Sequence, residues 1–256
     1  MLDSPCAALA PLLKKLEMWA PLGEPEQRAV LALPHTVRRL DPGQTIVWEG
    51  ERPAHACALL WGYAFRQKVA GNGARQILSI HMPGDMVDLH NALLGAADHG
   101  VQALTRVEAA FIPVDAVRAL AFAMPSVGMA LWHETLVDGS IFREWMLNVG
   151  RRDARARIAH LLCEFAVRLE AAGLGERSRY ELPMTQEQLA DATGLTSVHV
   201  NRTLKGLERD GLIERTIRAI STANWHDLAR AGDFQPGYLH LAHTSRPQLT
   251  RGFDGG

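Results

Sequence analysis

The segment spanning residues 185–208 constrains the fold of this chain more than any other. Thr185 precedes an apolar-periodic run, and Gln188 follows it at the spacing of a capping box. Gly194 can turn the chain at positive φ without steric cost, and Thr196 is suited to cap a second helix. The segment therefore predicts two short helices joined by a tight turn.

The second predicted helix, over residues 196–208, is amphipathic. Val200, Leu204 and Leu207 recur at helical spacing and would pack against the first helix. The positions left to point outward are Ser197, His199, Asn201, Arg202 and Lys205. Arginine can pair with guanine through two hydrogen bonds and asparagine with adenine, while serine and histidine can reach bases or phosphates. The pattern is that of a helix-turn-helix whose second helix enters the DNA major groove, although helical hairpins that bind no DNA share it.

Residues 211–221 follow this motif with apolar side chains set among charged ones. This texture predicts a two-stranded ribbon, the wing of a winged helix. Charge adds nothing to the case for DNA, because residues 185–218 contain five basic and five acidic side chains. The prediction of DNA binding rests on the pattern alone.

The whole chain has a formal net charge of −1, so it has no general attraction to nucleic acid or membrane surfaces. At 256 residues it is long enough for two domains with separate cores. Arginines concentrate just before the helix-turn-helix, at Arg143, Arg151, Arg152, Arg155 and Arg157. We expect them either to supply local positive charge or to form a solvated helix face with intrahelical pairs.

Compartment and redox state follow from two features of the chain. No apolar run approaches the roughly 20 residues that span a bilayer, and the N-terminus lacks the layout of a signal peptide. Cys6, Cys57 and Cys163 are too widely spaced for a disulfide framework or a zinc knuckle. We expect a soluble protein in the reducing cytoplasm.

Residues 35–113 have the texture of a β domain. Turn signals recur at 41–43, 61–62, 71–73 and 83–85. Strands are expected between them at 45–48, 56–60, 63–68, 75–80 and 103–112. Short strands punctuated in this way predict a small barrel or jelly roll.

A long helix is predicted over residues 126–149. Apolar residues recur there at alternating three- and four-residue steps, forming a seam of coiled-coil type at Trp132, Leu136, Gly139, Phe142, Met146 and Val149. Ile141 and Trp145 add a second apolar stripe, so two faces of the helix must be buried. One face could cover the β domain and the other a partner chain; the alternative is a helix buried on both faces within one monomer.

Four regions are expected in total: N-terminal helices and a β domain in 1–120, the long helix in 121–150, the winged helix in 151–222, and a tail in 223–256. Helices are predicted at 2–20, 25–33 and 153–172, the last ending at Gly173. Residues 173–183 read as a loop, and the tail is mostly polar around Trp225 and Tyr238.

This order of elements resembles the CRP/FNR family of bacterial transcription regulators. The most specific pieces are Leu-Asp-Pro-Gly-Gln at 40–44, Pro-Gly-Asp at 83–85, Leu-Pro-Met-Thr at 182–185 and the segment 194–202. The resemblance implies an α+β fold: a cyclic-nucleotide-binding-like β-roll (a double-stranded β-helix or jelly roll), a dimerisation helix, and a winged helix-turn-helix. It further implies a homodimer that binds a pseudo-palindromic operator in double-stranded DNA and works with RNA polymerase.

The resemblance also assigns the DNA-reading residues. Arg202 falls on the base-contacting arginine of the family, whereas Val198 stands where many members have a glutamate that accepts from cytosine. Val198 could instead touch a thymine methyl, so we expect an operator different from the family's best-known one. The expected base contacts are Ser197, Val198, His199, Asn201 and Arg202, and the expected phosphate contacts are Thr185, Thr196 and Lys205.

The effector region departs from the family pattern. The Gly-Glu-Leu segment that holds cyclic AMP corresponds here to residues 86–90, and the Arg-Ser pair that clamps its phosphate falls on His99 and Gly100. A cyclic phosphate needs a charge-assisted partner, which a neutral histidine does not supply. Oxygen-sensing members carry clustered N-terminal cysteines, but Cys6 stands alone and three cysteines cannot provide four thiolates. We expect neither cyclic AMP nor an iron–sulfur cluster, and no other cofactor is predicted.

Several imidazoles and carboxylates remain in this region: His81, Asp85, Asp88, His90 and His99. Such groups can ligate a metal, and histidine can hold haem, which leaves a metal- or haem-responsive regulator as an alternative. The spacing is irregular, so surface or hydrogen-bonded histidines are the plainer interpretation and no metal site is predicted. A cupin-type enzyme would need clustered histidine ligands, so no enzyme is expected; a nucleotide-type module without DNA activity is the remaining alternative.

Overall fold

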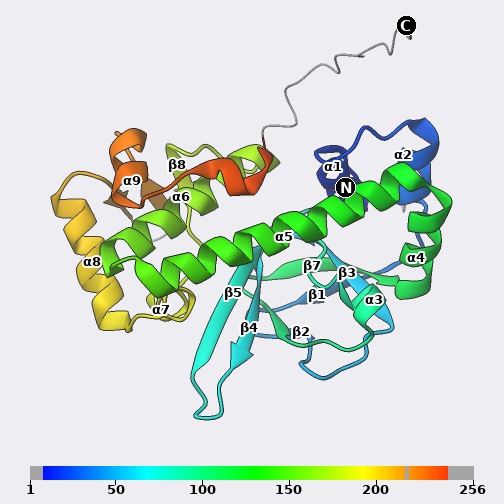
Figure 1. The fold of residues 1–256 in the computed structure, drawn as a ribbon, viewed down its shortest axis with the longest axis horizontal. Helices are drawn as coiled ribbons and strands as arrows, with labels where there is room; N and C mark the ends of the chain where they lie inside the picture. Colours follow the sequence, from blue (N-terminus) through cyan, green and yellow to red (C-terminus); the bar gives the residue numbers. More distant parts are fainter. Residues whose placement is uncertain (1–7, 217–218, 242–256) are drawn as a thin grey trace, which may run out of the picture.

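The computed structural model describes residues 8–216 and 219–241. A β-roll and a smaller C-terminal helical domain lie side by side, and the long helix α5 (Pro125–Arg151) runs across both (Figure 1). At about 1.5 Å per residue a helix of 27 residues is roughly 40 Å long. The two domains therefore share one rigid element. Cys6 lies outside the described residues.

The β-roll consists of two antiparallel sheets that enclose an apolar core. One sheet has the order β1 (Thr36–Leu40), β7 (Val107–Pro113), β3 (His55–Trp61). The other has the order β2 (Thr45–Val47), β6 (Gly100–Ala103), β4 (Ala64–Val69), β5 (Arg75–His81). Side chains from both sheets, such as Leu59, Val101 and Val107, are fully buried between them. The fold class predicted from the sequence is confirmed.

Two details of the roll differ from the predicted strands. Strand β1 was not predicted, because four of its five side chains are exposed and its pairing partner β7 is distant in the sequence. The single strand expected at 103–112 is two strands, β6 and β7. The chain turns between them because Leu104 and Thr105 both donate backbone hydrogen bonds to the carbonyl of Tyr63.

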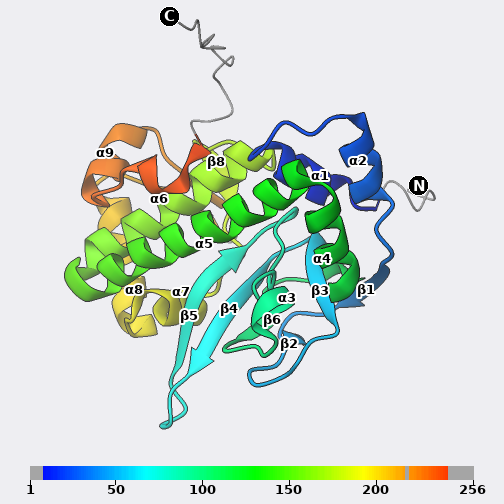
Figure 2. The same ribbon diagram turned by 45° about the vertical axis from the view of Figure 1, so that its right-hand side comes forward.

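Helices cover one end of the roll. They are α1 (Ala10–Glu17), α2 (Glu24–Leu31), α3 (Asn91–Leu94) and α4 (Val114–Ala123). α1 and α4 lie beside the N-terminal half of α5, as the rotated view shows (Figure 2). Leu12 and Leu16 of α1 are buried in one apolar cluster with Ala130 and Leu131 of α5. The helix predicted at 2–20 is shorter where it is described, and residues 1–7 lie outside the description.

The two apolar stripes of α5 have different environments. Ile141 and Trp145 are buried inside the monomer. In the seam, by contrast, Trp132 is 61% exposed, Leu136 55% and Met146 61%. Phe142 is also exposed, and Gly139 and Val149 are half-buried. The alternative of a helix buried on both faces within one chain is therefore wrong.

The C-terminal domain is a winged helix. Its elements are α6 (Ala154–Ala172), β8 (Arg179–Glu181), α7 (Gln186–Thr193), α8 (Ser197–Arg209), β9 (Glu214–Arg215) and β10 (Ala219–Ser221), with sheet order β8-β10-β9. The loop predicted at 173–183 is wrong at β8. There Tyr180 is buried opposite Ile220 and its hydroxyl donates to the carbonyl of Leu162 at 2.9 Å.

The segment after the wing also folds, which corrects the predicted tail. Helix α9 (Trp225–Ala231) is capped by Asn224, and the 3-10 turn η2 (Pro236–Leu239) packs on α5. Gly232 passes so close to α6 that an added Cβ would lie 2.6 Å from the backbone nitrogen of His160. Buried Leu228, Phe234 and Leu239 anchor this segment. Residues 242–256 lie outside the description.

The described helices differ from membrane-spanning helices in length or in hydropathy. No single one of them is both long and apolar enough to cross a bilayer. Taken together, α4 and α5 would pass by length and composition, but they are bent by 120° at their junction.

Candidate functional site

The helix-turn-helix is built by the local interactions that its sequence predicts. The Thr185 hydroxyl accepts from the backbone N–H of Gln188 at 3.2 Å, and the Gln188 side-chain oxygen accepts from the backbone N–H of Thr185 at 2.9 Å. This reciprocal pair is the predicted capping box. Gly194 has φ +64° in the turn, and Thr196 caps α8 by accepting from the backbone N–H of His199. The start of α8 is fixed by these contacts.

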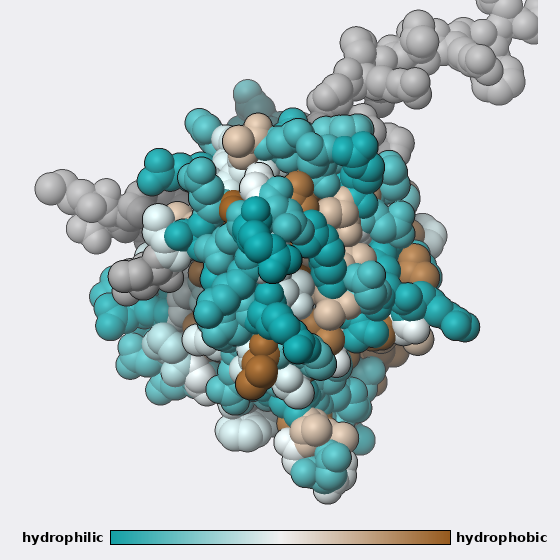
Figure 3. Space-filling model, turned by 90° about the vertical axis from the view of Figure 1, so that its left-hand side faces the viewer, coloured by the Kyte–Doolittle hydropathy of each residue, from teal (hydrophilic) through white to brown (hydrophobic). Residues whose placement is uncertain are grey.

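Helix α8 presents a polar face to solvent. Val200, Leu204 and Leu207 are buried against α6 and α7. The exposed positions at and after the N-terminus of α8 are Thr196, Ser197, Val198, His199, Arg202 and Lys205, whereas Asn201 is half-buried. The end of the molecule that carries this domain is mostly hydrophilic, with small separate apolar spots (Figure 3).

The cations on α8 are available to an external partner. Among the described residues, Arg202 and Lys205 form neither a side-chain hydrogen bond nor an ion pair with protein. Glu208, the acid on the same helix, is held instead by Arg215, whose Nη2 lies 2.8 Å from Glu208 Oε2. Because free guanidinium and ammonium groups point outward from a capped helix, this face is suited to bind an anionic polymer.

Three of the five arginines before the motif contact other parts of the chain, whereas Arg143 and Arg151 are exposed and form neither a side-chain hydrogen bond nor an ion pair within the described residues. Arg152 lies 2.7 Å from Glu144 and 3.1 Å from Asp233, which joins α5 to the segment after α9. Arg155 pairs with Asp210 at 2.7 Å, beyond the end of α8. The remaining contacts are those of Arg157, which donates to the carbonyls of Arg152 and Thr193. These pairs link different elements, whereas the sequence suggested either DNA-facing charge or intrahelical pairs.

The β-roll contacts the helix-turn-helix directly. Arg75 of β5 lies 2.7 Å from Asp191 of α7, and its guanidinium stacks over Phe65. Gln76 donates to the carbonyl of Ala192 at 3.4 Å. No local sequence pattern joins residues so far apart in the chain, so sequence reasoning missed this contact.

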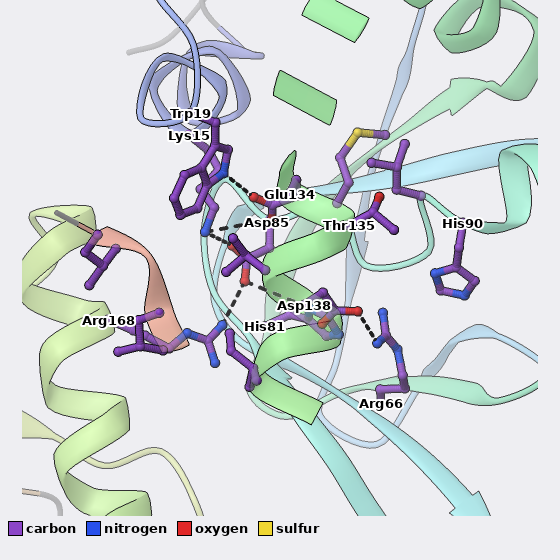
Figure 4. Close-up of a pocket in the computed structure, with 16 residues that line it drawn as sticks. Lys15, Trp19, Arg66, His81, Asp85, His90, Glu134, Thr135, Asp138 and Arg168 are labelled. Carbon is purple, nitrogen blue, oxygen red and sulfur yellow. Dashed lines mark hydrogen bonds and ion pairs between the residues drawn. The ribbon is translucent and has the colours of Figure 1, made fainter. Parts of the chain in front are cut away.

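A cavity of about 50 Å³ lies where α1, the roll, α5 and α6 meet. Figure 4 shows Asp85 of the roll at its centre, between Lys15 of α1 and Arg168 of α6. Asp85 lies 2.8 Å from Lys15 and 3.2 Å from Arg168. Glu134 of α5 lies 3.8 Å from Lys15 and accepts from Trp19. Ion pairs around the cavity thus link α1, the β-roll, α5 and α6.

Burial and charge set the ionisation of these groups. Burial acts to raise the pKa of Asp85, but Lys15 and Arg168 outweigh it and hold that pKa at about 2. Burial raises the pKa of Glu134 to about 7, against the pull of Lys15. His81 is buried beside Arg66, and both effects lower its pKa to about 3. At neutral pH Asp85 is therefore ionised and His81 is neutral.

The four residues predicted for an effector pocket lie in different surroundings. Asp85 and His90 line the cavity, and Asp88 and His99 do not. Asp88 is buried and accepts from the backbone N–H of Cys57 at 2.8 Å, and burial raises its pKa to about 7. His90 and His99 lie together, with ring centroids 4.8 Å apart.

Sequence reasoning missed the other charged residues of the cavity. Lys15, Glu134 and Arg168 belong to three different helices, so no motif spacing connects them. Asp138 of α5 was missed for the same reason, and it lies 2.5 Å from Arg66 of β4. The one sequence signal that could have identified these four residues is a charged side chain on an otherwise apolar face of a helix.

A β-roll joined by a long helix to a winged helix with a free polar face defines a two-domain DNA-binding regulator. Residues 37–123 match the model of the cyclic nucleotide-binding domain, and residues 156–231 match that of the Crp-like helix-turn-helix domain. The chain belongs to the CRP/FNR family of transcription regulators and is a sequence-specific DNA-binding regulator.

Individual relatives and structures agree with this assignment. The transcriptional activator protein FnrL of Cereibacter sphaeroides is 32% identical over 219 residues, which cover 84% of this chain and 88% of FnrL. The nitrogen fixation regulation protein FixK of Azorhizobium caulinodans is 27% identical over 57% of this chain and 58% of its own. The structure of FixK2 from Bradyrhizobium japonicum matches with a TM-score of 0.71 at 24% identity, over 78% of this chain and 98% of that one. At this identity the likeness to FixK2 concerns the fold alone.

Proposed function

We propose that the regulator acts as a homodimer that pairs through the seam of α5. The observation that supports this is the exposure of Trp132, Leu136, Phe142 and Met146 on one side of a single helix. Contiguous apolar surface of this kind on a protein of moderate size marks an interaction site. The coiled-coil spacing of the seam favours a second copy of the same helix as the occupant.

Pairing along α5 would place the two α8 helices about 34 Å apart, so that they enter successive major grooves on one face of the DNA. In this arrangement Ser197, His199, Asn201 and Arg202 contact bases, and Val198 touches a thymine methyl. Contacts to phosphate come from Thr185, Thr196 and Lys205. Asn201 is half-buried, so we assign it a smaller share of the contact than Arg202. The operator would be pseudo-palindromic.

We infer that neither cyclic AMP nor an iron–sulfur cluster controls this protein. By the sequence resemblance, His99 and Gly100 fall on the family's phosphate clamp, and two of the three guanidinium nitrogens of the nearby Arg66 are held by Asp138 and by the carbonyl of Val87. Regulation rather than catalysis is the proposed role, in the cytoplasm. The name of FnrL describes a transcriptional activator, which supports activation of transcription as the role of this chain too. RNA polymerase is the partner that this role would require.

The test is DNA binding by the full-length chain across a salt series. Wild type should protect a two-fold footprint, and log K should fall linearly with log salt concentration. Arg202→Ala should lose about 1–3 kcal/mol of binding free energy and relax specificity at one base pair, whereas Lys205→Ala should weaken binding to all sequences and reduce the salt slope by about 1.

Arg230→Ala is the matched control, because Arg230 is an exposed arginine in the same domain that pairs with Asp227 away from α8. It should bind as wild type does. Equal affinity of Arg202→Ala and wild type for the footprinted site would contradict the assignment of α8 as the reading helix.

A further inference from the structure

Two histidines and an aspartate come together beside α3 of the β-roll. His90 precedes α3, and Asp98 and His99 precede β6. The candidate ligand atoms of the three residues all lie within 4.8 Å of one another. The chain returns to His90 through the short helix and a left-handed turn at Gly95, which has φ +79°. The fold thus assembles donors whose sequence spacing matches no metal motif.

The hydrogen bonds of His99 leave one ring nitrogen free. Nδ1 of His99 lies 2.6 Å from Oδ1 of Asp98. If this nitrogen carries the proton and donates to the carboxylate, Nε2 keeps its lone pair. His99 is only 4% exposed, so its Nε2 is shielded from solvent. Within residues 8–216 and 219–241 this atom has no hydrogen-bond partner.

His90 has the same unmet requirement. Its Nε2 is buried, and it too has no hydrogen-bond partner in the described part of the chain. A buried polar atom without a partner costs free energy comparable to a lost hydrogen bond, and native proteins rarely leave one unsatisfied. Two such nitrogens on rings 4.8 Å apart therefore indicate a shared ligand.

We propose that the Nε2 atoms of His90 and His99 bind a divalent transition-metal ion of the Zn²⁺, Co²⁺ or Ni²⁺ class, and that Asp98 supports His99 by accepting from its Nδ1. Imidazole and carboxylate are donors that suit these ions, and a carboxylate that accepts from the far nitrogen of a ligating histidine is their usual support. Ligand atoms that lie 2.0–2.1 Å from a tetrahedral ion are about 3.3 Å from one another. The candidate ligand atoms here lie within 4.8 Å, so small side-chain rotations would bring them to that separation. The two imidazole donors leave two positions of a tetrahedral ion for water or a small molecule.

The charges nearby favour a cation over an anion. Asp98 contributes a carboxylate at the site itself. Two cations lie nearby, and each is paired. Lys68 donates to the backbone carbonyl of Asp98 at 2.6 Å and lies 2.7 Å from Glu49. Arg66 lies 2.5 Å from Asp138 and donates to the carbonyl of Val87. Within the described residues only Nε of Arg66 is without a hydrogen-bond partner, so this guanidinium offers an anionic ligand a single donor. A metal ion is held instead by the lone pairs of the two imidazoles.

The position gives the metal a route to the rest of the molecule. His90 lines the same cavity as Arg66 and Asp138 (Figure 4), and Asp138 belongs to α5. Metal binding at His90 would therefore act next to the ion pair that joins the roll to this helix. The site goes beyond the proposed mode of DNA reading and does not depend on it.

The experiment uses the full-length chain, without an affinity tag and treated with chelator. Zn²⁺ is titrated by calorimetry and Co²⁺ by visible absorption, which reports coordination geometry. Wild type should bind one ion per chain at this site. His90→Ala and His99→Ala should each weaken binding at least about 100-fold, and Asp98→Asn about 10-fold, as loss of supporting groups does in metal sites.

His55→Ala is the control, because His55 is an exposed histidine at the start of β3. It should bind as wild type does. Should His99→Ala fail to fold because its ring is buried, His90→Gln at the half-buried position decides by the same criterion. Unchanged affinity in the His90 variants would overturn the proposal. Wild-type binding no tighter than about 1 mM would overturn it too, and would leave water as the partner of the two nitrogens.

Discussion

Loss of Arg168 should destabilise the protein more than loss of any surface ion pair. Its side chain is 11% exposed and lies 3.2 Å from Asp85 and 3.5 Å from Glu164, both almost fully buried. It also donates to the carbonyl of Ile80 at 2.8 Å. Arg168→Met keeps much of the apolar stem but removes the charge, so two buried carboxylates from different domains lose a counter-charge.

The size of the effect follows from what remains around those carboxylates. Removing one partner of a buried ion pair costs about 3–5 kcal/mol, because the other charge stays buried. Lys15 remains 2.8 Å from Asp85, and Trp145 and Tyr238 still donate to Glu164. We therefore expect a loss near the lower end, about 3 kcal/mol in the free energy of unfolding. That is a large share of a total of about 5–15 kcal/mol.

Urea unfolding at pH 7, followed by circular dichroism, measures this loss. Arg230→Met is the control, since its pair with Asp227 is exposed and should change stability by less than about 0.5 kcal/mol. Combining Arg168→Met with Asp85→Asn should cost less than the sum of the single changes, because the double variant leaves no unpaired charge at Asp85. A loss below about 1 kcal/mol for Arg168→Met, or full additivity, would refute the reasoning.

Four further outcomes are expected. Lowering the pH toward 2 should destabilise wild type as Asp85 becomes protonated, because its folded pKa of about 2 lies below the ordinary 3.8; acid unfolding of Arg168→Met should begin at higher pH. Leu136→Glu should give a monomer in light scattering, whereas Leu93→Glu on exposed α3 should not change the mass. Thr185→Ala should lose about 1 kcal/mol in thermal unfolding with its capping box. Gly232→Ala should lose about 1–3 kcal/mol by the same measurement, because its Cβ would meet the backbone of α6.

The helix-turn-helix was predictable because its determinants are local. A cap at Thr185, a glycine at the turn and a second cap at Thr196 lie within a dozen residues, and each forms the expected contact. The two stripes of α5 were predictable for the same reason, since helical periodicity is a property of one segment. Which stripe faces the monomer core depends on the roll and α6, so it needed the structure.

Elements held by distant partners escaped prediction. Strand β1 has a mostly exposed sequence and exists because β7 offers backbone hydrogen bonds. Strand β8 depends on the burial of Tyr180 under α6, and α9 on a close approach of Gly232 to the same helix. In each case tertiary contacts, rather than the local sequence, determine that the element forms.

The effector region shows the same limit at the level of a site. The sequence pattern drew attention to Asp85 and His90 but placed them in one pocket with Asp88 and His99. In the structure Asp85 forms an ion pair with Lys15, whereas Asp88 accepts a hydrogen bond from the backbone N–H of Cys57. Irregular spacing predicted no metal site at His90 and His99, and it gave no sign that the two rings lie 4.8 Å apart, because the short helix α3 folds the chain back between them.

The contacts between the roll and the C-terminal domain determine where a signal could act. Reorienting the winged helix requires breaking the Arg75–Asp191 and Arg168–Asp85 pairs, because both join that domain to the roll. The first is about a quarter exposed and contributes about 0–1 kcal/mol. The second is buried, so its loss costs several times more. A ligand shifts this equilibrium only by its different affinity for the two arrangements. Of these two ion pairs, the buried one at Asp85 therefore contributes more to holding the winged helix in its present orientation than the one at α7.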